Sequence, residues 1–200
     1  MDRAARKKFI ELTQRRIKPG SGSSVSFLKT RTWTHPVANI SNLLTVPYTI
    51  VGGVATRLYM PARKTPNLDI LIHTASAAQL YPELATTATR LGELSFGGTS
   101  WQLADRTLLS ILTDERPWVT EALTQPNFAP DGQPIIALPY LVLMKLATSR
   151  TSDLGDLSRM LGQASELELA RVKSIIAIYD RESLEDLESL IQLGRLEFET

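Results

Sequence analysis

Residues that could do chemistry gather between residue 48 and residue 72. There an apolar run leads into the pair Gly52-Gly53, and a second apolar run carries Asn67 and Asp69. A glycine pair between a strand and a helix exposes backbone N–H groups, which bind phosphate at a helix N-terminus. An amide and a carboxylate that alternate on a strand face the same side, where their oxygens can hold a metal ion. The pattern predicts a phosphate and metal site; the alternative is a tight turn that needs glycine only for its backbone shape.

Cationic and titratable residues lie close to this stretch in the sequence. Arg57 and Arg63 follow the glycine pair and are candidates for phosphate contacts, or else plain surface charge. His73 lies four residues beyond Asp69 and on the same face of an extended strand. It is a candidate for phosphate contact or proton transfer, and the alternative is an exposed histidine at a strand end.

A second group of charges lies farther along the chain. Lys145 and Arg150 precede Asp153 and Asp156, and the two aspartates share one helix face because they are three residues apart. Lys145 is a candidate cation beside a bound triphosphate. The alternative is an ion-pair network that holds two helices together, which is the interpretation favoured for the aspartates.

The stretch Val51-Gly52-Gly53 followed by Asn67-Leu68-Asp69 resembles the signature of the nucleotidyltransferase superfamily. In that family an apolar residue and Gly-Gly or Gly-Ser precede two carboxylates that alternate on a strand. The run from Gly52 to Leu58 and the basic Arg63-Lys64-Thr65 look like the branch that contains minimal nucleotidyltransferases and abortive-infection toxins. The run from Tyr140 to Leu146 is similar to the helix that packs behind the site in that branch, so the resemblance covers residues 37 to 162.

The resemblance implies an enzyme in which two metal ions and a nucleoside triphosphate meet between carboxylates. This chain departs from that pattern at two positions: Asn67 stands at the first carboxylate and Ser110 at the third. Asp69 is then the one expected metal ligand in place, so Mg²⁺ and a nucleoside triphosphate should bind weakly, if they bind. A one-residue change of strand register would instead bring Asp105 or Asp114 to the site.

Three functions follow as hypotheses. The favoured one is a degenerate nucleotidyltransferase, an inactive homologue that binds a nucleotide or a protein partner, in the toxin-antitoxin or phage-defence setting that the resemblance implies. The second is an active metal-dependent enzyme that moves a nucleoside monophosphate from a nucleoside triphosphate onto RNA, protein or a small molecule, with Asp69 and Asn67 as catalytic residues. The third is a helical module that forms a dimer through an apolar stripe of Leu184, Leu187, Leu190 and Ile191.

Composition excludes several classes of protein. The 200 residues have 43% hydrophobic content, a net charge of +1 and no cysteine. A packed core is therefore expected, while disulfides, thiolate catalysis and cysteine-ligated zinc are excluded. No apolar run approaches the roughly 20 residues of a membrane helix, so a cytoplasmic protein is expected. The one basic run, from Asp2 to Ile17, is typical of a solvated helix more than of a nucleic-acid interface.

The elements that must position these residues predict an α+β fold, with a nucleotidyltransferase-like mixed sheet flanked by helices and a C-terminal helical portion. Three segments are expected: a basic helix and flexible connector over 1–26, the α+β core over 27–138, and the helical portion over 139–200. The predicted strands are 48–51, 68–72, 94–96, 101–103 and 108–112. The predicted helices are 35–45, 76–91, 117–123, 140–147, 153–161, 166–179 and 183–193, with 54–59 compatible with helix.

Overall fold

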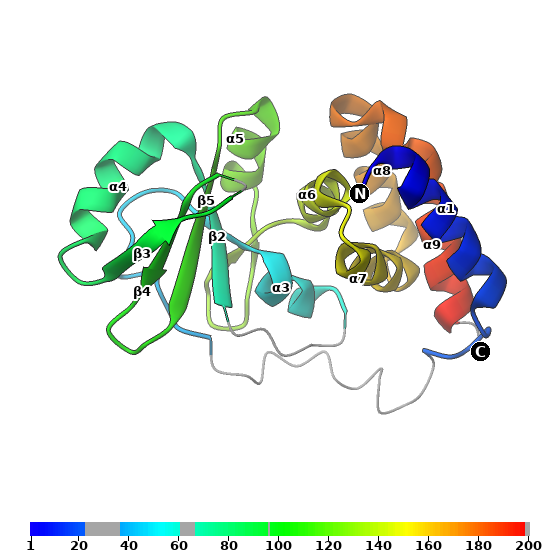
Figure 1. Ribbon diagram of the computed structural model, residues 1–200, viewed down its shortest axis with the longest axis horizontal. Helices are drawn as coiled ribbons and strands as arrows, with labels where there is room; N and C mark the ends of the chain where they lie inside the picture. The colour runs from blue at the N-terminus through cyan, green and yellow to red at the C-terminus, as the bar shows by residue number, and fades with distance from the viewer. Residues whose placement is uncertain (23–36, 61–66, 96, 199–200) are drawn as a thin grey trace. The chain divides into compact units, whose positions relative to one another are not determined.

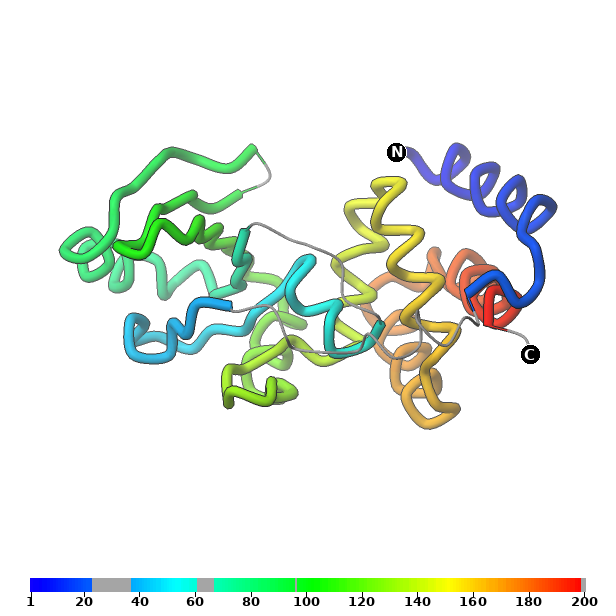
Figure 2. The backbone as a smooth tube through the Cα atoms, turned by 90° about the horizontal axis from the view of Figure 1, so that it is seen from below, coloured from blue at the N-terminus to red at the C-terminus, as the bar shows by residue number. Residues whose placement is uncertain are grey.

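The computed structural model describes residues 1–22, 37–60, 67–95 and 97–198 (Figure 1). The chain forms two compact units, traced again in Figure 2. The sheet unit comprises Trp33–Leu58 and Arg63–Ala137, and the helical unit comprises Met1–Thr32, Tyr59–Ala62 and Leu138–Thr200. A mixed sheet with its own helices, together with a C-terminal helical portion, makes the fold α+β and confirms the predicted class.

One mixed sheet, with strands in the order β3-β4-β5-β2-β1-β7-β6, forms the body of the sheet unit. The strands are β1 (Thr49–Val51), β2 (Asn67–His73), β3 (Thr89–Glu93), β4 (Thr99–Gln102), β5 (Leu108–Asp114), β6 (Asn127–Phe128) and β7 (Pro134–Ile135). β2 is parallel to β5 and β1 is parallel to β7, whereas all the other neighbours are antiparallel. A tight turn joins β4 to β5 and is closed by a hydrogen bond from Leu103 N to Thr107 O.

The two central strands, β2 and β5, have one largely apolar face and one face that mixes apolar and polar side chains. Five aliphatic side chains on the largely apolar face are each at most 2% exposed: Leu68, Ile70, Ile72, Leu109 and Ile111. Burying each such side chain contributes about 1.5–3 kcal/mol, so this face anchors both strands in the core. Since alternate residues point to opposite sides, Asn67, Asp69 and Ser110 share the other face.

The sheet unit also contains short helices in the connections between its strands. They are α3 (Gly52–Ala55), η1 (Thr56–Leu58), η2 (Thr74–Ser76), α4 (Ala77–Leu84) and α5 (Pro117–Thr124). α3 contacts β1 and β2, and α5 contacts β2. The prediction of a helix from Pro117 is confirmed, with the proline in the first turn, where its missing N–H costs nothing.

The predicted helix 35–45 is wrong where it can be followed, because residues 41–43 form only a turn. Residues 35 and 36 lie outside the described residues. The Asn39 side chain accepts a hydrogen bond from Ser41 N at 3.0 Å, and Ile40 N donates to the Gln133 side chain at 3.0 Å. These bonds satisfy backbone groups locally and compete with a helix despite the apolar spacing.

The predicted helix 76–91 ends at Leu84, and the strand expected at 94–96 is instead β3 at Thr89–Glu93. Threonine hydroxyls at 86 and 87 bond back to the carbonyls of Glu83 and Leu84, which closes the helix. Pairing with β4 then draws the following residues into the sheet edge. Tertiary pairing overrides the local helix propensity of the alanine-rich stretch.

The helical unit contains α1 (Arg3–Arg16), α6 (Leu138–Thr148), α7 (Thr151–Gly162), α8 (Glu166–Tyr179), η3 (Arg181–Ser183) and α9 (Leu184–Phe198). Each of the α-helices matches a predicted helix, although α9 extends five residues beyond the predicted end at residue 193, whereas η3 was not predicted. Ser165 caps α8 in a capping box with Glu168. On α9, Leu187, Leu190 and Ile191 are at most 3% exposed, and the helix contacts α1, α7 and α8. The apolar stripe therefore packs inside this unit.

No helix in the described part of the chain has the length and hydropathy of a membrane span.

Two glycines allow α7 and α9 to cross in backbone contact. A Cβ atom added at Gly194 would lie 1.9 Å from Ser158 O and 2.8 Å from the Cα atom of Gly162. A Cβ atom added at Gly162 would lie 2.4 Å from the Gly194 carbonyl carbon. All three distances are below the 3.0 Å that real Cβ contacts respect, so any larger side chain forces the helices apart.

Candidate functional site

The glycine turn and Asp69 are in direct contact. Gly52 has a φ of +64°, a left-handed conformation that glycine adopts without strain. A Cβ atom at Gly52 would lie 2.3 Å from Asp69 Oδ2, so the missing side chain leaves the space that the carboxylate occupies. The sequence predicted that Gly52 and Asp69 belong to one site formed by two strands. In the structure β1 pairs with β2, and Val51, which precedes Gly52, lies opposite Asp69.

The sheet register brings a row of small and polar residues beside this carboxylate. Asp69 on β2 lies opposite Ser110 on β5, and Ser110 lies opposite Ser100 on β4. Neighbouring strands are about 4.8 Å apart, so these side chains are direct neighbours on one face. The register places neither Asp105 nor Asp114 opposite Asp69.

Both alternative acids are engaged elsewhere. Asp105 lies in the turn between β4 and β5, where its Oδ1 accepts a hydrogen bond from Thr107 N at 2.9 Å. Asp114 ends β5 opposite His73 and accepts hydrogen bonds from the Arg116 side chain at 2.9 and 3.1 Å. Partial burial opposes ionisation of Asp114, but the Arg116 hydrogen bonds and charge hold its pKa below the usual value.

The donor set of Asn67, Asp69 and Ser110 does not fit a two-metal centre. It offers one carboxylate, one amide oxygen and one hydroxyl, whereas Mg²⁺ prefers several anionic oxygens in octahedral geometry. Among the described residues, no group of three or more His, Cys, Asp or Glu side chains could hold a metal ion. This face of the sheet lacks the charge that a metal-bridged phosphate needs.

Arg57 is the strongest candidate for anion binding in the sheet unit. It is 5% exposed, and its Nε and Nη1 atoms are buried with no hydrogen-bond partner among the residues that the structure describes. Burial lowers the pKa of the guanidinium, because a low-dielectric environment disfavours its charge. A buried arginine normally has every donor paired, so these free donors call for an anionic ligand.

Thr49 is a polar residue near the site that the sequence analysis missed. It lies on β1 and is fully buried, and its hydroxyl has no hydrogen-bond partner in the described part of the chain. The signal in the sequence is a single threonine inside an otherwise apolar strand, which β propensity alone explains equally well. His73, by contrast, accepts a hydrogen bond from Ala75 N at 3.2 Å and so caps η2.

Lys145 lies in the helical unit, inside an ion-pair network. Its Nζ donates to Asp153 Oδ1 at 3.0 Å and to Asp156 Oδ2 at 2.8 Å, and all three side chains are buried. Asp153 also accepts hydrogen bonds from Arg150 Nε at 2.7 Å and from Thr148 Oγ1 at 2.8 Å. The structure therefore contains the helix-linking network that the sequence analysis gave as an alternative. Arg63, the remaining candidate, lies outside the described residues.

The chain is similar to two solved structures of the protein ANT(2'')-Ia. The crystal structure of that protein in complex with adenylyl-2''-tobramycin has 14% identity and a TM-score of 0.41, covering 74% of this chain and 87% of that one. The solution structure of the same antibiotic-resistance factor has 16% identity and a TM-score of 0.40, covering 74% and 82%. No protein-family model matches the chain. No curated protein matches it either.

Replacing Gly52 by alanine should destabilise the sheet unit. The left-handed backbone alone costs an alanine about 1–2 kcal/mol, and displacement of the Asp69 carboxylate adds about 1 kcal/mol. Gly132→Ala is the matched control, since Gly132 has a φ of +82° with nothing within 4 Å of an added Cβ. Chemical denaturation should show the larger loss for Gly52→Ala, and Asp69→Ala should remove the excess. Equal losses at the two glycines would show that Asp69 does not fill the space at Gly52.

Stability should depend on pH through Asp153. Burial opposes its ionisation, but the Arg150 hydrogen bond, the Lys145 charge and further hydrogen bonds lower its pKa in the folded protein. A lowered pKa stabilises the fold above the unfolded value of about 3.9, and that contribution is lost as pH falls through the lower folded-state pKa. Urea denaturation of Asp153→Asn should therefore show a deficit of about 3 kcal/mol at pH 7 that shrinks below about pH 4. A deficit that stays constant from pH 7 to pH 3 would contradict this.

Proposed function

We propose that the sheet unit binds the phosphate groups of a nucleotide beside the Gly52-Gly53 turn, and that it has little or no nucleotidyl-transfer activity. The observation that carries this proposal is the buried Arg57 guanidinium with two atoms unpaired. A phosphate offers several acceptor oxygens and a compensating charge, which together satisfy a planar guanidinium.

The position of Arg57 in the chain supports the same site. It lies four residues after Gly53, at the point where α3 continues into η1. Side chains on a helix lean toward its N-terminus, so we infer that the guanidinium points back toward the glycine turn. At that turn Gly52 is half-buried and Gly53 is buried, and neither has a side chain to cover its backbone.

The single carboxylate at the site supports the loss of transfer chemistry. In a two-metal mechanism, carboxylates hold the ions that neutralise the transferred phosphoryl group. Here Asn67 and Ser110 supply neutral oxygens, and Asp69 is the one formal anion of the three. Asp69 without a bridging cation repels a phosphate, so binding falls to Arg57 and backbone donors.

The test is calorimetric titration of the full chain with ATP, GTP, CTP and UTP, each with magnesium and with EDTA. Binding of at least one nucleotide is expected in EDTA, and Arg57→Met should weaken it by about tenfold or more. Arg90→Met is the matched control, because Arg90 is an exposed arginine of the same unit.

Thermal denaturation separates a binding role from a structural one. An unpaired buried charge opposes folding, so Arg57→Met without ligand should melt at the same temperature as the wild type or higher. A large loss of melting temperature in Arg57→Met, or the absence of binding by all four nucleotides, would overturn the proposal.

A further inference from the structure

The N-terminal helix α1 is attached to the helical unit mainly by charge. It lies beside α9, and of its fourteen residues only Arg6 and Ile10 are buried. Leu12 remains 43% exposed on the helix. A helix that buries one aliphatic side chain has little hydrophobic attachment, so polar contacts must supply most of its hold.

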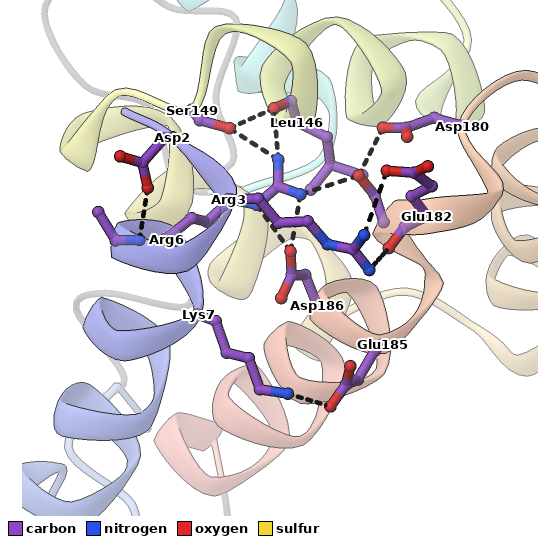
Figure 3. Close-up of polar contacts among 12 residues, drawn as sticks. Asp2, Arg3, Arg6, Lys7, Leu146, Ser149, Asp180, Glu182, Glu185 and Asp186 are labelled. Atoms are coloured by element: carbon purple, nitrogen blue, oxygen red, sulfur yellow. Dashed lines mark hydrogen bonds and ion pairs between the residues drawn. The ribbon is translucent and has the colours of Figure 1, made fainter.

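Arg6 makes the central contact, as Figure 3 shows. Its Nε donates to Asp186 Oδ2 at 2.7 Å, and its Nη2 donates to Ser183 Oγ at 2.9 Å. Its Nη1 donates to Leu146 O at 2.9 Å and to Ser149 Oγ at 2.8 Å, at the end of α6. Arg6 thus enters a polar receptor formed by the end of α6, η3 and α9.

Two exposed ion pairs flank this contact. In both, as in the pair of Arg6 with Asp186, the cation lies on α1 and the carboxylate lies on η3 or α9. Arg3 donates to the Glu182 carboxylate at 3.1 Å, and Lys7 donates to Glu185 Oε1 at 2.6 Å. We call the surface formed by Glu182, Ser183, Glu185 and Asp186 the acidic face. Exposed pairs of this kind are weakened by salt, so the docking of α1 should depend on ionic strength.

The chain after α1 permits release. Two backbone hydrogen bonds, from Gly20 N to Leu196 O and from Gly22 N to Glu197 O, hold it along the end of α9. Residues 18–22 include Pro19, Gly20 and Gly22, which have low helix propensity, so α1 does not continue into this segment. Opening α1 therefore disrupts few apolar contacts, and such an element opens before the core unfolds.

We propose that α1 is a detachable strap and that the acidic face is a docking surface for the α1 helix of a second copy of this chain. The acidic face of a second copy carries the same charges as the face that holds α1 within one chain. Two copies can therefore exchange their α1 helices without forming any new kind of contact. In the wild type, the tethered helix has a local concentration in the millimolar range, which favours the monomer in dilute solution.

Charge reversal converts this exchange into a directed test. One full-length variant carries Arg3→Glu and Lys7→Glu, and the other carries Glu182→Lys and Glu185→Lys. Within each variant the strap and the face repel each other. Between the two variants, both combinations are complementary, so an equimolar mixture should form a dimer with reciprocally exchanged straps. The chain that carries all four substitutions is the control, since it restores attraction within one molecule.

Light scattering measures the mass of each sample, and amide hydrogen exchange measures how firmly α1 is held. Each variant alone should be monomeric, with α1 amides exchanging about tenfold faster or more than in the wild type. The mixture should have the mass of a dimer at low salt and lose it in about 0.5 M salt. The fourfold variant should be a monomer with a protected α1. A mixture that stays monomeric, or α1 amides that stay protected in each variant alone, would overturn the proposal.

Discussion

Gly194→Ala should destabilise the helical unit by about 3 kcal/mol or more, although alanine is the better helix former. The added Cβ would lie 1.9 Å from Ser158 O and 2.8 Å from Gly162 N. These neighbours are backbone atoms, which cannot rotate away, so α7 and α9 must separate and lose packing along their length. Thermal denaturation should show a loss of about 6–12 °C for a chain of this size.

Gly155→Ala in α7 is the matched control. An added Cβ there meets nothing within 4 Å, so the substitution should stabilise the protein by up to about 1 kcal/mol through helix propensity alone. A loss of stability in Gly194→Ala together with a gain in Gly155→Ala would establish that glycine is required where α7 and α9 approach closely. A gain of stability in both variants would show that α7 and α9 can separate without loss.

Restoring carboxylates should create a metal site in the sheet unit. The double variant Asn67→Asp and Ser110→Asp places three carboxylates side by side, because Asn67 shares the face of Asp69 and Ser110 lies opposite it. Three adjacent anions repel one another and attract a divalent cation, so Mg²⁺ or Mn²⁺ affinity should rise about 100-fold or more over the wild type. Calorimetry measures the affinity, and the melting temperature of the double variant should rise with added metal.

The control for this prediction adds the same number of carboxylates but places the second one on β4 instead of β5. Asn67→Asp with Ser100→Asp adds the same two carboxylates, but Ser100 lies opposite Ser110 and so is two strands from Asp69. At about 4.8 Å per strand, its carboxylate is too far to share an ion with Asp69. An equal gain of affinity in the control would show that added charge, and not the register, creates the site.

The strands that carry Asp69 and Ser110 were predictable because their apolar residues alternate or run continuously at the length of a buried strand. The place of Ser110 beside Asp69 followed from that pattern together with the family resemblance. The end of α4 was not predictable, since Thr86 and Thr87 close the helix through side-chain bonds that no periodicity shows.

Tertiary contacts account for the other differences. Gly162 and Gly194 are 32 residues apart, and only the helix crossing reveals that each excludes a side chain on the other. The sequence placed an arginine at residue 57, but the burial of its guanidinium without partners depends on packing. Packing also decides the role of α1. Its basic residues predict a solvated helix, but in the structure Arg6 is buried and bonded to Asp186.

The affinity of ATP in EDTA, compared between the wild type and Asp69→Asn, tests the central claim most directly. If Arg57 and the glycine turn bind phosphate without a metal, the wild type binds ATP in EDTA, and Asp69→Asn binds at least as tightly because a repulsive charge is gone. Binding that requires magnesium and is lost in Asp69→Asn would contradict the claim and establish Asp69 as the ligand of a working metal site.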